Sequence, residues 1–332
     1  MAPLPPLSPE RFVGRTNVVA QIEERLRHPE FLSSSVVGGP QIGKTSLLRY
    51  LSRSPSVRAA DGARVLQVIY DAEILGSNAT PFDFWTGALR ELRSHPDAEP
   101  LADLVKSTIA RAAASELDEY DLQDVFDAAA RGGLRIALLI DNFDNALRNN
   151  NFWRNNDFFH HVRTLGQRMP RGLAFTVATM RPLLDYWRPG VSASPFYNIF
   201  LNFPLEMLSD AELHDHVDRV LHDHAVDDPT GTVIEMVISA SRGHPLVAAY
   251  VLELSVGPMA SGRPLDPDDL ADRLSDPAGP LVVLSRRIRE ALTPSERHLL
   301  DRLLNEEPLQ PAERDRLRYL GSYGLLPPGV TA

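Results

Sequence analysis

One short segment near the start of the chain constrains its fold more than any other feature. Two glycines, a lysine and a threonine stand at fixed spacing in Gly38-Gly39-Pro40-Gln41-Ile42-Gly43-Lys44-Thr45. Loops of this pattern wrap their backbone N–H groups around phosphates, and they join a buried strand to the start of a helix. The flanking sequence fits, because 31–37 is apolar enough for a strand and 44–51 carries leucines at helical spacing. The segment therefore predicts a strand, a phosphate loop and a helix.

The chemistry of the loop predicts a role for its residues. Gly38 and Gly43 allow the backbone to curve around the phosphates. The ammonium group of Lys44 is expected to contact the β and γ phosphates, and the hydroxyl of Thr45 to bind Mg²⁺. We therefore expect the whole loop, together with Ser46 after it, to bind ATP or ADP with Mg²⁺.

A second predicted strand ends in acidic and amide residues. The run 134–140 is almost continuously aliphatic, as in a strand covered on both faces of a parallel sheet, and Asp141-Asn142-Phe143-Asp144 follows it. An aspartate at this place typically holds a water bound to Mg²⁺, as in a Walker B strand, so Asp141 is the candidate; a helix-capping aspartate is the alternative. Asn142 stands where many such ATPases have a glutamate, and it can orient a water but cannot accept its proton. Asp144 is an alternative base, although its odd spacing from Asp141 tends to place it on the other face of an extended strand.

A third predicted strand leads into a cation. The run 173–179 is followed by Met180 and Arg181. If this strand lies parallel to the second, Arg181 is presented at the ligand edge of the sheet, where it can sense the γ-phosphate. The alternatives are a solvated arginine at a strand end, or Arg188 as the sensor.

The order of strands and helices predicts the fold class. Strands alternate with helices up to about residue 205, which is typical of a three-layer α/β core with a parallel sheet. Beyond it, capping boxes that begin at Ser209 and Thr293 predict helices. We expect an extended arm, a phosphate-loop NTPase core, a helical lid, a linker and a small helical tail, at 1–10, 11–205, 206–256, 257–282 and 283–332.

Composition limits the possible partners and settings. The chain of 332 residues is 43% apolar and 23% charged, and it lacks cysteine, which excludes disulfides and thiolate chemistry. It has no apolar run of the roughly 18 residues that cross a membrane, so we expect a soluble, cytoplasmic protein with no membrane partner. The net charge of -10 counts against nucleic acid as a partner.

The order of these motifs resembles the STAND class of ATPases, which are signal-transduction relatives of the AAA+ ATPases. Besides the features above, the resemblance rests on Phe12-Val13-Gly14-Arg15 before the loop and on Gly243-His244-Pro245 in the helical region. It implies that Val13 and Arg15 lie near the adenine, that Arg181 reads the γ-phosphate, and that Pro245 packs on the base from the lid. The segment 293–326 resembles the first helices of a winged-helix domain, which in this class closes over the nucleotide in the resting state.

The resemblance implies a nucleotide-dependent switch. Exchange of ADP for ATP would reorient the lid and tail and so control assembly or the binding of a protein partner, with slow hydrolysis by a weak ATPase. Two alternatives stay open. One is a DNA-binding ATPase of the origin-recognition or loader kind, which shares the Val-Gly-Arg element, and the other is a nucleotide-bound scaffold that never turns over.

Overall fold

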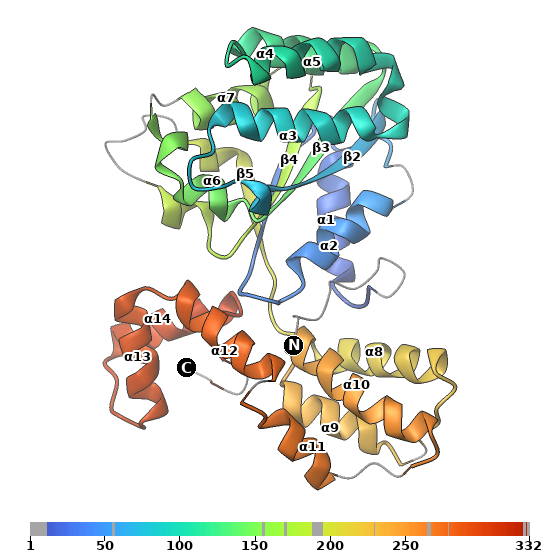
Figure 1. Ribbon diagram of the computed structural model, residues 1–332, viewed down its shortest axis with the longest axis vertical. Coiled ribbons are helices and arrows are strands. Elements are labelled where there is room, and N and C mark those ends of the chain that lie inside the picture. The colour runs from blue at the N-terminus through green and yellow to red at the C-terminus, as the bar shows by residue number, and fades with distance from the viewer. Residues whose placement is uncertain are drawn as a thin grey trace. The chain divides into compact units, whose positions relative to one another are not determined.

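The structure is a computed structural model that describes residues 12–54, 57–154, 157–168, 171–187, 195–228, 230–263, 267–277, 279–327 and 330 (Figure 1). The chain divides into two compact units. The sheet unit comprises Asn17–Val37 and Lys44–Phe203, and the helical unit comprises Met1–Thr16, Gly38–Gly43 and Pro204–Ala332. The expected extended arm at 1–10 lies outside the described residues.

The sheet unit is built on a five-stranded sheet in the order β2-β3-β4-β1-β5. Its strands are β1 (Ser33–Val37), β2 (Arg64–Asp71), β3 (Leu134–Asp141), β4 (Leu173–Thr179) and β5 (Phe200–Pro204). β3 pairs in parallel with both β2 and β4, and β4 pairs in parallel with β1. Every residue of β1, β3 and β4 is buried, which suits the largely apolar sequences of β3 and β4, whereas β1 buries three serines ahead of its two valines. Parallel pairing brings the carboxyl ends of these strands to one edge of the sheet.

Helices and short 3₁₀ turns surround the sheet (Figure 1). The helices are α1 (Thr16–Arg27), α2 (Lys44–Arg53), α3 (Pro81–Ser94), α4 (Ala102–Ala113), α5 (Glu119–Arg131), α6 (Asp144–Arg148) and α7 (Asp157–Gln167). The turns are η2 (Ala72–Ile74), η3 (Pro96–Leu101), η4 (Asn150–Phe152), η6 (Leu183–Tyr186) and η7 (Phe196–Ile199). Capping boxes start α3 at Thr80 and α5 at Asp118. The α/β core with a parallel sheet that the sequence predicts is confirmed.

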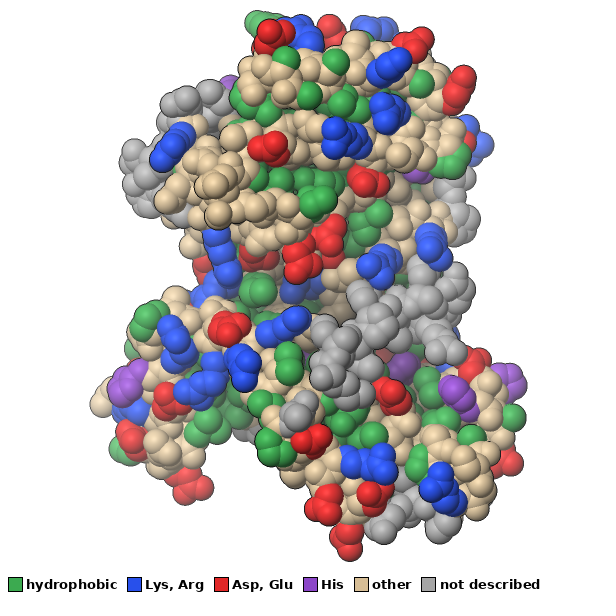
Figure 2. All heavy atoms as spheres, in the orientation of Figure 1, with side chains coloured by type: hydrophobic (Ala, Val, Ile, Leu, Met, Phe, Trp, Pro, Cys, Tyr) green, Lys and Arg blue, Asp and Glu red, His purple; other side chains and the backbone are tan. Residues whose placement is uncertain are grey.

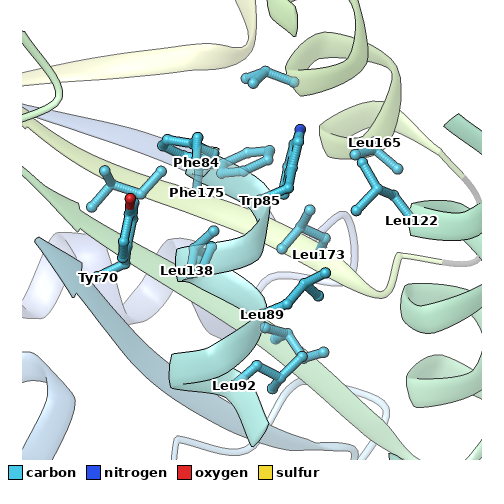
Figure 3. Packing of buried hydrophobic residues seen from close by; sticks show 14 of the residues in the cluster. Tyr70, Phe84, Trp85, Leu89, Leu92, Leu122, Leu138, Leu165, Leu173 and Phe175 are labelled. Carbon is cyan, nitrogen blue, oxygen red and sulfur yellow. The ribbon is translucent and has the colours of Figure 1, made fainter. Parts of the chain in front are cut away.

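An aromatic cluster between α3 and the sheet forms much of the core (Figure 3). Phe84 of α3 meets Tyr70 of β2 and Phe158 of α7 edge to face, with ring centroids 5.2 and 4.9 Å apart. This geometry is favourable for aromatic pairs beyond the area that they bury. Gly87 lies close to the ring of Tyr70, where a Cβ would collide with it. The packing of α3 therefore fixes the end of β2, which carries site residues.

The described part of the helical unit beyond β5 consists of helices. They are α8 (Asp210–Asp223), α9 (Thr232–Ser241), α10 (Pro245–Ala260), α11 (Pro267–Leu274), α12 (Pro280–Ala291), α13 (Pro294–Leu304) and α14 (Pro311–Ser322). The capping boxes at Ser209 and Thr293 form as the sequence predicts, with Glu212 and Glu296 as their third residues. The helical C-terminal region of the predicted fold class is thereby confirmed.

The segment 257–282 contains more helix than a linker would. α10 continues to Ala260, and α11 occupies the proline- and aspartate-rich stretch after it. Asp268 and Asp269 in the first turn of α11 suit the positive end of a helix, and Leu270 is buried. Proline and aspartate mark a helix start here rather than an unstructured connection. Over the described residues, none of the helices has the length and apolar character needed to cross a bilayer.

Candidate nucleotide-binding site

Lys44 is the first residue of α2 and is only 9% exposed. Burial lowers the pKa of Lys44, while the nearby carboxylates of Asp144 and Asp141 act in the opposite direction. A buried ammonium group is costly unless negative groups surround it. The two carboxylates supply that charge within the sheet unit, and phosphate oxygens would supply more.

Asp141 ends β3 and is 2% exposed. Burial raises the pKa of Asp141, a hydrogen bond from the side chain of Thr45 lowers it, and the charge of Asp71 raises it again. The Asn142 N–H donates to Asp141 Oδ1 at 3.0 Å. A hydroxyl oxygen beside a carboxylate is the kind of hard oxygen donor set that Mg²⁺ prefers. Thr45 and Asp141 therefore fit the metal that the sequence predicts, and these two residues would hold it.

Asn142 lies in a left-handed backbone conformation with φ of 50°. Asparagine tolerates this region better than most residues, which is one reason for its presence after β3. Its Nδ2 donates to Asp71 Oδ1 at 3.0 Å. Asn145 likewise donates to the Ala72 carbonyl at 3.1 Å. Two amide side chains thus tie the segment after β3 to the segment after β2.

The carboxylate of Asp144 is buried and already engaged. Its two oxygens accept from the Met180 N–H at 3.1 and 3.2 Å, and Oδ1 also accepts from the Tyr186 hydroxyl. Burial, followed by the charge of Asp144, raises the pKa of Tyr186, so the phenol stays protonated and donates. Asp144 therefore links the turn after β3 to the turn after β4.

Arg181 follows β4 and is 7% exposed. Its guanidinium group lies 3.8 Å from the carboxylate of Asp185. The Thr179 hydroxyl donates to the Arg181 carbonyl at 2.7 Å, which fixes the backbone at this point. The guanidinium group of Arg181 is thus buried and oriented within the sheet unit. Arg181 directly follows Met180, whose N–H donates to Asp144. Arg188, the alternative sensor, lies outside the described residues.

Within the helical unit, the phosphate loop contacts the tail. The Gly39 N–H donates to the Tyr323 carbonyl at 2.5 Å, just after α14. A Cβ at Gly39 would overlap the carbonyl of Gly324, so only glycine fits here. Gln41 and Gly43 have φ of 59° and 99°, which gives the loop its curvature.

The Val-Gly-Arg element contacts the start of α8 in the same unit. The Arg15 N–H donates to Glu212 Oε1 at 2.6 Å, while Glu212 Oε2 caps α8 through Ser209. Burial lowers the pKa of Arg15, and Nη2 of its guanidinium group is buried without a hydrogen-bond partner among the described residues. Val13 is half-buried beside it in the chain. A ligand acceptor beside this donor would supply the hydrogen bond that the described residues do not.

His244 and Pro245 begin α10. The imidazole of His244 is fully buried, and burial lowers its pKa to about 4. The backbone of Pro40, in the phosphate loop, raises this pKa and the nearby charge of Arg15 lowers it, so both groups lie close to the ring. Pro245 is half-buried in the first turn of α10. Residues that the sequence assigns to the loop, the Val-Gly-Arg element and the lid therefore lie together in the helical unit.

Comparison with solved structures identifies the fold. A Walker-type ATPase of Pyrococcus abyssi has a TM-score of 0.61 and 15% identity, over 96% of this chain and 92% of that one. The Orc1 protein of Aeropyrum pernix in complex with DNA has a TM-score of 0.52 and 16% identity, over 95% and 78%. The chain shares the fold of these two proteins. No protein-family profile and no curated protein matches its sequence.

Several residues of the candidate site were not found from the sequence. Asp71 ends β2 as Asp141 ends β3, so the rule that found Asp141 would have found it too. Glu212 was evident as a capping residue, but its contact with Arg15 spans 197 positions and has no local signal. Tyr186 and Tyr323 act through long-range contacts, and nothing in their neighbourhood distinguishes them from core tyrosines.

Proposed function

We propose that the protein is an ATP-dependent switch of the STAND class that hydrolyses ATP slowly. The observation that carries this proposal is the hydrogen bond from the Gly39 N–H to the Tyr323 carbonyl. It joins the loop expected to hold the phosphates to the tail that would change position. A ligand can shift an equilibrium only through differential contacts with the two states, and the γ-phosphate differs between ATP and ADP at this loop.

The proposed ligand is ATP or ADP with Mg²⁺. Lys44 and the loop residues around it would bind the phosphates, and Thr45 and Asp141 would hold the metal, which neutralises charge on the phosphates when bound. Val13, Arg15 and Pro245 would hold the base, and the orphaned Nη2 of Arg15 supports a ligand in that region. Arg181 would read the γ-phosphate from the end of β4.

Slow turnover follows from the residue after Asp141. A positioned general base contributes about 10² to 10⁴ in rate, and Asn142 stands where a glutamate often supplies it, so a base on a neighbouring strand would give only the lower end of this gain. Slow hydrolysis suits a switch, because the ATP state then lasts long enough for assembly or for a protein partner to bind. If the rate of hydrolysis fell to zero, the protein would be a nucleotide-bound scaffold.

The likeness to Orc1, which was solved with DNA, favours a second candidate, a DNA-binding ATPase. The charge of the tail counts against it. Four of the eight arginines of α12–α14 pair with acidic side chains, in Arg289–Asp301, Arg302–Glu313, Arg316–Glu296 and Arg318–Asp315. On the face shown in Figure 2, basic and acidic side chains are intermixed. Phosphate backbones attract surfaces with an excess of basic groups, whereas 283–320 has eight arginines against seven acidic residues, so the switch is the better-supported proposal.

Hydrogen exchange of α14 tests the switch. With saturating Mg-ADP and Mg-ATP, we expect different protection of 311–322, because the two ligands place different charge at the loop that bonds to Tyr323. Gly39→Ala should expose α14 with either nucleotide, since its Cβ overlaps Gly324. Gly257→Ala is the matched control, because a Cβ at Gly257 meets no atom within 4 Å. Identical protection of the wild-type tail with both nucleotides would support the inert scaffold instead.

A further inference from the structure

The ends of β2 and β3 bring a carboxylate next to the amide of Asn142. Asp71 and Asp141 are register partners at the ends of these parallel strands. Asp71 is exposed, whereas Asp141 is buried. Asn142 Nδ2 donates to Asp71 Oδ1 at 3.0 Å, although the two residues are 71 positions apart. An exposed carboxylate and a water-orienting amide therefore lie together beside the two residues that would hold the metal.

The carboxylate of Asp71 is fixed through one oxygen only. Oδ1 also accepts from the Glu73 N–H at 2.9 Å, which caps η2. Both bonds go to Oδ1, so Oδ2 accepts no hydrogen bond from the described residues. The position is further held by Asn145, which donates to the Ala72 carbonyl next in the chain. Asp71 thus has a defined orientation and an oxygen available to a water molecule.

The other candidate base lacks such an oxygen. Both oxygens of Asp144 accept from the Met180 N–H, and the Tyr186 hydroxyl adds a third bond. Asp144 is 5% exposed, and a proton moved to it would disturb these bonds. The role of base, for which the sequence offered Asp144, therefore needs a different residue.

We propose that Asp71 accepts the proton of the attacking water, with Asn142 orienting that water. This inference rests on the proposed ATP hydrolysis. The water oxygen bonds to the γ-phosphorus, and the bond from that phosphorus to the bridging oxygen breaks, so that ADP leaves with its electron pair. One proton of the water passes to Asp71 Oδ2, and the remaining hydroxyl stays on the phosphorus as part of inorganic phosphate. Release of the proton to solvent restores the carboxylate.

The test separates binding from turnover in Asp71→Asn. Isothermal titration of ATP in the presence of Mg²⁺ gives the affinity, and single-turnover hydrolysis at saturating ATP gives the rate. We expect the rate to fall about a hundredfold, as for loss of a positioned base, while the affinity changes less than about threefold. Glu73→Gln is the control, because Glu73 is an exposed acid on the same turn, and it should keep both values.

A double variant adds a readout that a purely structural role would not give. Asp71→Asn with Asn142→Asp restores one carboxylate and one amide with their places exchanged, and aspartate tolerates the left-handed backbone at position 142. We expect it to turn over about tenfold faster than Asp71→Asn alone, if a shared water is held between them. A double variant no faster than the single one contradicts the proposed pair.

The outcomes distinguish this inference from the proposed function. Wild-type protein that fails to bind ATP overturns the switch itself. Wild-type protein that binds ATP but releases no phosphate overturns the role of Asp71 and leaves the scaffold. An unchanged rate in Asp71→Asn, or a loss of ATP affinity as large as the loss of rate, likewise overturns it.

Discussion

The carboxylate of Asp144 shows how one residue can connect two loops of the site. It begins α6, and its hydrogen bonds reach Met180 and Tyr186, which flank the turn that contains Arg181. Removal of one donor to such a buried carboxylate lowers the stability of the fold, because the carboxylate has left water and then lacks one of the hydrogen bonds that replaced it. The position of Arg181 therefore depends on Asp144, and Asp144 on the hydroxyl of Tyr186.

At this residue scale we predict that Tyr186→Phe lowers the free energy of unfolding by about 1 to 3 kcal/mol, since it removes one donor to a buried carboxylate. In an Asp144→Asn background the same change should cost less, with a coupling of about 0.5 kcal/mol or more. Urea unfolding of the four proteins measures this coupling. Tyr120→Phe is the control, because Tyr120 is 73% exposed. Strictly additive effects would contradict the proposed link.

Among the elements, α10 of the helical unit follows an unusual capping residue. His244 precedes its first turn, is fully buried, and has a pKa lowered to about 4 by burial. The folded state therefore holds a neutral imidazole, whereas the unfolded chain takes up a proton below about pH 6.5. Stability from this histidine is complete above about pH 6.5 and is lost as the pH falls toward 4.

The helical unit should accordingly lose about 2 kcal/mol of stability between pH 7 and pH 5 through His244. Thermal or urea unfolding of the wild type and of His244→Phe over this range tests the prediction. The variant, which cannot take up the proton, should show a shallower loss. His214→Gln, at an exposed position of α8, should follow the wild type. Parallel curves for the wild type and His244→Phe would contradict the burial argument.

Some of these elements could be predicted from the sequence and others could not. Local sequence shows the aliphatic runs of β3 and β4 and the helical spacing of the leucines in α2. The core and its loop could therefore be predicted. α11 could not, because it is short, and the proline and aspartates that start it also occur in linkers. The engagement of Asp144 and the pairing of Asp71 with Asn142 depend on strand order, which fixes neighbours that lie far apart in sequence.

In the whole molecule, the chain leaves the sheet unit after Val37, contributes Gly38–Gly43 to the helical unit, and returns at Lys44. The phosphate loop thus belongs to the helical unit through its contacts. Gly39 bonds to Tyr323, and the backbone of Pro40 lies close to His244. A phosphate ligand on this loop would act on the helical unit directly. The proposed switch therefore requires that this loop binds nucleotide.

Binding of ATP to the wild type and to Lys44→Ala, measured by isothermal titration calorimetry with Mg²⁺, tests that claim most directly. Removing the buried ammonium group deletes a charge-assisted contact of about 1.5 to 3 kcal/mol, so the affinity should fall by about tenfold or more. Lys106→Ala is the matched control, because Lys106 is the other lysine of the chain and is exposed on α4. It should bind ATP as the wild type does. Equal affinities for the wild type and a folded Lys44→Ala, or no binding by the wild type, would contradict the account.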